Sequence, residues 1–311
     1  MLMACSAFLV ALPLLWLRRR QLAGTTLGSM WWWWVAMLSA LAGVELYLAV
    51  TVLESETVGV ALRFAAASLS FCPTMSVLGA KRPQDKAWNF IVLSLWVVVA
   101  LPALEAVTLH MDQPMELSTA RSWFLLVLVV VCLANRLGTR GAWAALVFAG
   151  GQVLLLVPYL PLGVGGYLAP WPTGGLVLLV ASVGVDVAGS RWRRQDRHGW
   201  DQLWLEFRDT FGTLWALRVA ERINAAAAIC DWDLRLTWRG FRVAEQDATP
   251  SEATAVPWDA ATEQTLRTTT VNLLRRFVTR EWIDARLPVA RDLEAETQAT
   301  ETSGLFHGEQ E

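Results

Sequence analysis

Long apolar segments separated by short charged turns fill the first 190 residues of the chain, and this alternation restricts the folds that it can adopt. A membrane core of about 30 Å requires about 20 predominantly apolar residues in one helix. Charged residues are sparse before Gly189 and dense after it. We therefore expect an all-α membrane protein in which residues 1–190 form a seven-helix transmembrane bundle. The expected spans are about 2–17, 30–53, 58–80, 88–109, 122–137, 142–160 and 172–190.

The basic residues of the loops predict the orientation of these spans. Cytoplasmic loops are enriched in Lys and Arg because basic flanks resist translocation. Only Arg121 clearly falls on one side of the expected bundle, and twelve basic residues fall on the other. The twelve are Arg18, Arg19, Arg20, Lys81, Arg82, Lys86, Arg136, Arg140, Arg191, Arg193, Arg194 and Arg197. This distribution predicts that the N-terminus is outside and the C-terminus is in the cytoplasm.

The first expected span is short, and two interpretations of it remain open. A signal peptide carries its positive charge before the apolar run, but here the arginines at 18–20 follow it. We expect residues 2–17 to be a retained anchor; without it, six spans with both termini inside satisfy the same loop charges. Of 26 basic residues only Lys81 and Lys86 are Lys, and this bias with abundant Ala suggests a GC-rich bacterial genome. The expected location is therefore the cell inner membrane.

Four ionisable residues lie in or near the apolar zone of these spans: Glu45, Arg63, Glu105 and Asp186. An Arg or Asp at the centre of a membrane helix costs about 2.5–3.5 kcal/mol on insertion scales, so such residues normally face a partner or water. With a rise of about 1.5 Å per residue, the first three fall in the outer half of the membrane and Asp186 falls near the inner face. We take Glu45, Arg63 and Glu105 as candidates for a ligand or ion pathway and Asp186 as an inner-face candidate.

The residues around Arg63 indicate which way its side chain points. Small or polar residues follow it at helical spacings: Ala66, Ala67, Ser70 and Thr74. Small residues on one stripe let a neighbouring helix pack closely, so Arg63 is expected to face the bundle. A buried guanidinium is strongly disfavoured without a carboxylate, and we expect it to pair with Glu45, Glu105 or both. Two interpretations remain open. In the first, these charges form a structural clamp, or Arg63 extends to the outer headgroups; in the second, they line a polar cavity open to the outside.

The sequence contains no recognised catalytic, cofactor or metal motif. Nucleotide-binding, hydrolase, EF-hand and zinc-protease patterns are absent. The four cysteines form no CxxC pair, so we predict neither a zinc site nor a disulfide framework. No catalytic residue, cofactor or metal is therefore assigned. Three prolines, Pro73, Pro102 and Pro158, lie within or near the ends of spans and predict kinks.

Residues 191–290 are predicted to form a small cytoplasmic domain that is α+β or mainly helical. Arg191 to Arg197 form a basic segment next to the membrane, and Asp186 is expected to be solvated or paired with Arg191 or Arg193. The segment is short, so we do not expect the protein to bind nucleic acid. A helix is predicted from Trp200 to Cys230 because apolar residues recur with a period of 3.6. Its apolar residues are Trp200, Leu203, Trp204, Phe207, Phe211, Leu214 and Trp215.

This helix either lies on the membrane surface or forms the core of a small domain, and we favour the core. Apolar and polar residues alternate from Leu234 to Arg239, which predicts a strand that ends at Gly240, with Phe241 and Val243 as a possible extension. A second helix is expected over about 258–286, with an apolar side that includes Phe277, Val278 and Trp282. Residues 291–311 are acidic and polar, which predicts a disordered tail.

Two functions follow from these features. The first is a scaffold or subunit of a membrane complex, because no catalytic motif is present and the apolar helix could dock a protein partner on the cytoplasmic domain. The alternative is a transporter or small-ligand-binding membrane protein with a polar site in the outer half of the bundle. An enzyme has the least support. The lipid bilayer is the expected partner in either case.

Overall fold

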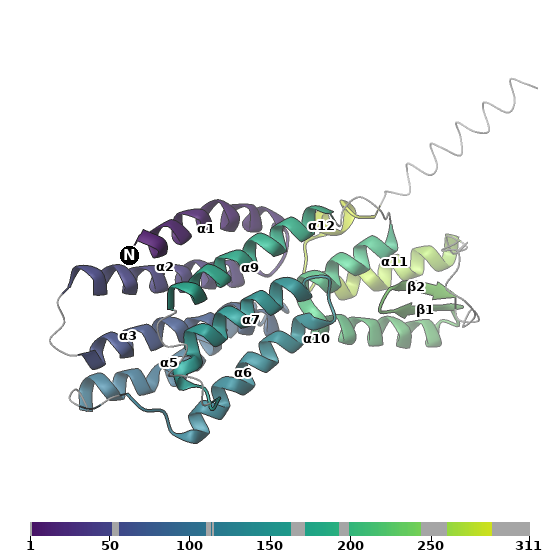
Figure 1. The fold of residues 1–311 in the computed structure, drawn as a ribbon. Coiled ribbons are helices and arrows are strands. Elements are labelled where there is room, and N and C mark those ends of the chain that lie inside the picture. Colours follow the sequence, from purple (N-terminus) through teal and green to yellow (C-terminus); the bar gives the residue numbers. More distant parts are fainter. Residues whose placement is uncertain are drawn as a thin grey trace, which may run out of the picture.

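The structure is a computed structural model, and it describes residues 2–51, 56–109, 113, 115–162, 172–192, 199–243 and 260–287. It is mainly helical (Figure 1), with the helices of the first 192 residues side by side and a smaller C-terminal unit at one end. Most of the outer loop at 161–172, most of the basic segment at 191–197 and the acidic tail lie outside the described residues. The first helices are α1 (Leu2–Gln21), α2 (Gly28–Val50), α3 (Glu56–Ser68), α4 (Cys72–Leu78), α5 (Asp85–Leu109), α6 (Thr119–Leu137), α7 (Ala142–Leu156) and α9 (Pro172–Trp192).

Five apolar helical segments in the described part of the chain are long enough to cross a membrane. They are Gly28–Val50, Glu56–Leu78, Lys86–Leu109, Thr119–Leu137 and Ala142–Tyr159. Large apolar side chains on them face outward, including Val50 and Phe90, which are 75% and 72% exposed. Such exposure suits a lipid environment, and the chain is therefore a multi-pass membrane protein in contact with a bilayer. The first and seventh predicted spans are also helical, as α1 and α9, but the apolar part of α9 is shorter, Thr173–Gly189.

The second of these segments is interrupted near the middle of the bundle. A single 3₁₀ turn, η1 (Leu69–Phe71), separates α3 from α4. Pro73, in the first turn of α4, has no backbone N–H, so it cannot bond to the carbonyl four residues earlier as an α-helix requires. The Cys72 N–H instead donates to the Leu69 carbonyl in the tighter pattern. The 3₁₀ turn lies next to Pro73, where a kink was predicted. Because Pro73 cannot donate to the carbonyl three residues earlier in this tighter pattern, the carbonyl of Ser70 is available to another helix.

The C-terminal unit consists of α10 (Trp200–Ile229), β1 (Leu234–Thr237), β2 (Gly240–Val243), α11 (Ala260–Leu274) and α12 (Arg280–Asp284). The apolar residues of the first half of α10 lie in its core. Leu203, Trp204, Phe207 and Phe211 are at most 4% exposed and pack with side chains of the hairpin and α11. The first half of α10 thus packs inside the C-terminal unit, whereas Leu214, one of the predicted apolar residues, is 40% exposed.

Two predictions about this unit need correction. The strand expected before Gly240 is present as β1, but Phe241 and Val243 do not extend it: they belong to β2, which pairs antiparallel with β1, and Thr237 lies opposite Gly240. The chain can reverse there because Gly240 has a φ of +133°, which only glycine adopts readily. The helix expected over 258–286 is divided into α11 and α12. The break exposes backbone groups that bond outside the unit, since Thr26 N–H donates to Phe277 O and Thr279 N–H donates to Gly24 O.

The loops at one end of the helical bundle hold the C-terminal unit through hydrogen bonds. Besides the two bonds just given, Arg82 N–H donates to Arg276 O at 2.8 Å, and the indole of Trp215 donates to Val77 O at 2.9 Å. Side chains from these loops, such as Leu27 and Ala80, belong to the same apolar cluster as α10. The C-terminal unit is therefore packed against the bundle, and it shares an apolar core with the loops at 22–27 and 77–82.

Candidate ligand-binding cavities

The first cavity, here called the distal cavity, lies in the half of the bundle away from the C-terminal unit. Its volume is about 320 Å³. Ligand pockets in proteins usually range from about 300 to 1,000 Å³, so only a small molecule fits. Its polar lining residues are Glu45, Glu56, Arg63 and Tyr159, and its apolar lining comes from α2, α3, α7 and α9. Two of the three outer candidates, Glu45 and Arg63, therefore line a cavity.

Arg63 and Glu45 form an ion pair in this cavity. Arg63 Nε donates to Glu45 Oε1 at 2.7 Å, and Arg63 Nη2 donates to Glu45 Oε2 at 3.3 Å. The side chain of Glu45 is 20% exposed and that of Arg63 is 45% exposed. Two parallel bonds neutralise both charges, while one face of the guanidinium stays accessible to the cavity. The expected pairing of Arg63 with Glu45 is present, because α2 and α3 are neighbours in the bundle.

Glu105, the third outer candidate, has a different partner. Arg121 donates to both of its carboxylate oxygens, at 2.7 and 3.0 Å, and this pair joins α5 to α6. Arg121 was the single basic residue that the loop charges placed on the outer side, and its carboxylate partner explains how it is accommodated there. Glu105 is not among the residues that line the distal cavity.

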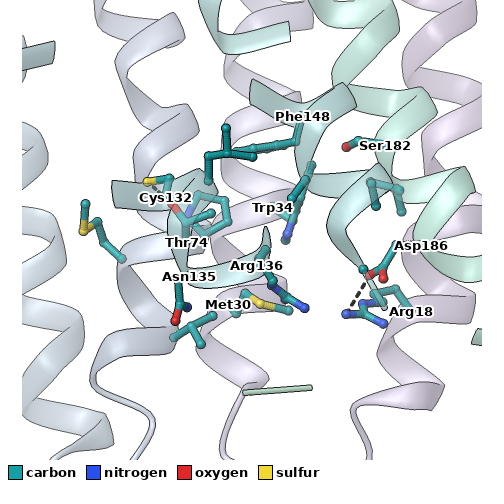
Figure 2. Close-up of a pocket in the computed structure, with 18 of the residues that line it drawn as sticks. Arg18, Met30, Trp34, Thr74, Cys132, Asn135, Arg136, Phe148, Ser182 and Asp186 are labelled. Carbon is teal, nitrogen blue, oxygen red and sulfur yellow. Dashed lines mark hydrogen bonds and ion pairs between the residues drawn. The ribbon is translucent and has the colours of Figure 1, made fainter. Parts of the chain in front are cut away.

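A second cavity, here called the proximal cavity, lies next to the C-terminal unit and is smaller, with a volume of about 70 Å³. Figure 2 shows polar side chains of several helices around it, among them Thr74, Cys132, Asn135 and Ser182. The Thr74 hydroxyl and the Cys132 sulfur lie 2.8 Å apart, and Thr74 also donates to Phe71 O. Most of this cavity's polar lining is thus neutral.

The charged residues of the proximal cavity lie at its edge. Asp186 Oδ2 accepts from Arg18 Nη2 at 2.7 Å (Figure 2), so the inner-face candidate pairs with the end of α1. Asp186 was expected to be solvated or paired with Arg191 or Arg193; Arg193 and the side chain of Arg191 lie outside the described residues, and Arg18 comes from a distant part of the sequence. Arg136 Nη1 donates to Asp209 O, and Asn135 Oδ1 accepts from the Leu214 N–H. These two lining residues therefore also hold α10, and the C-terminal unit lies over this cavity.

A layer of buried side chains separates the two cavities. Three helices, α2, α7 and α9, line both cavities: α2, for example, gives Leu41 and Val44 to the distal cavity but Met30 and Trp34 to the proximal one. Between these two pairs, Met37 and Leu38 of α2 are fully buried. The layer, here called the central layer, consists of Met37, Leu38, Ser70, Gln152 and Leu179, each 0% exposed.

The central layer contains one buried polar contact. Gln152 Nε2 lies 3.2 Å from both the carbonyl and the hydroxyl oxygen of Ser70, and it donates to them. The other amide atom, Oε1, is buried and has no hydrogen-bond partner among the described residues. A buried acceptor without a donor is costly and rare. A solute or water molecule carrying a donor would relieve that cost.

Sequence reasoning did not identify Gln152, Tyr159, Arg18 or Arg136 as site residues. Gln152 is the one strongly polar residue in the apolar run 142–157, and a search for neutral amides within spans would have found it. The other three depend on which helices are neighbours. Among the described residues, no three His, Cys, Asp or Glu side chains come together to hold a metal ion.

Comparisons with known proteins give no relative. No family model matches the chain, and neither the curated proteins nor the solved structures contain a significant match.

Proposed function

We propose that this protein transports a small polar solute across the membrane. The observation that supports this proposal is the pair of cavities that share the lining helices α2, α7 and α9 and are separated by the central layer. A solute site that is accessible from one side at a time requires such an arrangement: two openings and one barrier between them. A bundle built only for packing would fill this space with side chains.

The composition of the path favours a solute with hydrogen-bonding groups and little net charge. Arg63 and Glu45 neutralise each other at one end, and Arg18 and Asp186 do so at the other. Between them the path offers the neutral groups of Ser70 and Gln152. A lone ion would lose its water there without gaining a counter-charge.

We also propose the topology that the loop charges predict: seven spans, with the N-terminus outside and the C-terminal unit in the cytoplasm of a bacterial cell with the protein in its inner membrane. The distal cavity would then open to the outside and the proximal cavity to the cytoplasm. The position of Arg18 and Arg136 at the proximal end agrees with the enrichment of basic residues on the cytoplasmic side.

Single cysteines in a chain otherwise free of cysteine test the transport proposal. Ala67→Cys places a thiol in the distal cavity, Ala145→Cys in the proximal cavity and Leu179→Cys in the central layer. A membrane-impermeant thiol reagent is added to either face of oriented vesicles, and the exposed position Arg235→Cys reports the side of the C-terminal unit.

Transport predicts that the Ala67→Cys and Ala145→Cys thiols react from opposite faces. It also predicts that the Leu179→Cys thiol reacts slowly from both faces, because the layer must open to each side in turn. If that thiol is protected from both faces, or if both cavity thiols react from the same face, the chain is not a transporter of this kind.

A second candidate, the scaffold or complex subunit, is favoured by exposed apolar residues on the second half of α10. Leu217 and Ile229 are 55% and 85% exposed. The face of the first half, on which this function was first based, packs inside the C-terminal unit. Extraction in mild detergent followed by purification through a C-terminal tag tests the scaffold: a stoichiometric partner that is lost in Leu217→Ser/Ile229→Ser favours it, and a solitary protein contradicts it.

A further inference from the structure

Four basic residues from two distant parts of the chain meet where the C-terminal unit contacts the bundle. Lys81 and Arg82 lie in the loop between α4 and α5, and Arg275 and Arg276 directly follow α11. The bond from Arg82 N–H to Arg276 O, at 2.8 Å, brings the two backbones together. We call these four residues the basic cluster.

The charges of the basic cluster have no carboxylate partner in the part of the chain that the structure describes. Within the described residues, none of the four forms an ion pair with a carboxylate. The side chains of Arg82, Arg275 and Arg276 are exposed. Like charges held together repel one another unless an anion lies between them. The cluster therefore favours an anionic partner.

Its position in the fold indicates which anion. Lys81 and Arg82 lie between two apolar segments, one that ends at Leu78 and one that begins at Lys86, so they lie at the level of the lipid headgroups. The enrichment of basic residues in cytoplasmic loops accounts for the presence of Lys81 and Arg82. It does not account for Arg275 and Arg276, because these two residues flank no span. The contacts of the 24–26 loop with Phe277 and Thr279 fix the second pair at the same level.

We propose that the basic cluster binds the phosphate of an anionic phospholipid and that this lipid joins the C-terminal unit to the membrane. Guanidinium groups donate two parallel hydrogen bonds to phosphate oxygens, and the bilayer supplies such phosphates at this depth. Exposed apolar side chains at the start of α5, such as Phe90, offer the acyl chains a surface. The inference is independent of transport.

The test compares two double variants of the full-length protein that lose the same charge. Arg82→Gln/Arg276→Gln removes the two bonded residues of the cluster. Arg235→Gln/Arg239→Gln removes two exposed arginines of the β1–β2 hairpin that form no ion pair among the described residues. Each protein is incorporated into nanodiscs with equal amounts of phosphatidylglycerol and phosphatidylcholine. Native mass spectrometry of the released protein then measures the lipids that remain bound.

The unsubstituted protein and the hairpin variant should retain phosphatidylglycerol in preference to phosphatidylcholine. The cluster variant should lose this preference by about 30-fold, because one basic residue near a membrane surface contributes about a fivefold gain in affinity. Equal retention by the two variants overturns the proposal. So does displacement of the lipid by millimolar inorganic phosphate, because the cluster would then be a site for a soluble anion.

Discussion

The side-chain amide of Gln152 on α7 donates to the carbonyl and to the hydroxyl oxygen of Ser70, each at 3.2 Å, in the layer between the two cavities. Ser70 belongs to the 3₁₀ turn that interrupts the span Glu56–Leu78. Irregular backbone at membrane depth must be satisfied by a neighbouring helix, and Gln152 provides this bond. The same contact lies in the central layer, which is the barrier of the proposed transport path, so the fold and the proposed function depend on one pair of residues.

Shortening Gln152 should open the barrier. Gln152→Ala removes most of the side chain and should connect the two cavities, whereas Gln152→Met keeps its length and should leave the layer closed. In proteoliposomes under an osmotic gradient of urea or glycerol, the Ala variant should swell faster than both the unsubstituted protein and the Met variant. Equal rates for all three proteins would show that Gln152 does not limit access.

The ion pair of Glu45 and Arg63 in the distal cavity should show a larger coupling free energy than a more exposed ion pair. Glu45→Gln leaves Arg63 without a counter-charge, so the single variant should unfold at a lower temperature than the double variant Glu45→Gln/Arg63→Gln. The coupling free energy should be about 1–2 kcal/mol, between the values for surface and buried pairs. Thermal unfolding in mild detergent measures the unfolding temperature of each variant and so gives their order of stability.

Glu105 and Arg121 provide the matched control for this cycle. Their side chains are 37% and 43% exposed, and the same substitutions there should give a coupling below about 1 kcal/mol. A larger coupling at this pair than at Glu45 and Arg63 would contradict the assignment of the distal cavity as the more enclosed site.

Apolar runs in the sequence predicted the positions of the membrane-region helices, because a helix of this kind depends on the residues within its own segment. All seven expected spans are helices, and five of them are long and apolar enough to cross a membrane, because apolar runs of that length have few other solutions. The pairing of Glu45 with Arg63 was predictable because their helices are consecutive. The helices of Glu105 and Arg121 are also consecutive, whereas the partner of the more buried Asp186 depends on α1 lying beside α9.

The C-terminal unit was predicted less well for a similar reason. The segment 275–279 continues the apolar periodicity of the preceding helix through Phe277 and Val278, but its backbone bonds to residues 24–26 rather than continuing the helix. Nothing local to the segment reveals those bonds. The kink in α10 was also not predictable from local sequence. Gly212 has φ +82° and ψ 179° there, and this conformation is explained by the close approach of Asn135 from α6.

Replacing that glycine should release the C-terminal unit from the bundle. A Cβ at position 212 would lie 2.7 Å from the side-chain nitrogen and the carbonyl oxygen of Asn135, in addition to the strain of a positive φ. Gly212→Ala should therefore cost more than the approximately 1–3 kcal/mol of backbone strain alone. Limited proteolysis should cleave the variant faster within residues 136–141.

Gly199 provides the control for this prediction. Its φ is +79°, but a Cβ there would contact nothing within 4 Å. Gly199→Ala should carry the strain without the clash and should leave the docking intact. If both alanine variants are cleaved at the same rate, then the contact with Asn135 does not hold the unit.

The adjacent residues Thr25 and Thr26 form different hydrogen bonds: the Thr26 hydroxyl bonds to another loop, and the Thr25 hydroxyl bonds within its own loop. The hydroxyl of Thr26, which is 8% exposed, donates to Ala80 O, while the hydroxyl of the partly exposed Thr25 donates to Leu22 O at 2.7 Å. Thr26→Val keeps the shape but leaves a buried carbonyl without this donor, which should cost about 1–3 kcal/mol. Thr25→Val should cost less, because water can reach the Leu22 carbonyl. Hydrogen exchange should accelerate at residues 80–82 and 276–279 in Thr26→Val only, since the Thr26 bond links these segments. Acceleration in both Thr26→Val and Thr25→Val would mean that the loop responds as a whole. The Thr26 bond would then have no special part in docking the C-terminal unit.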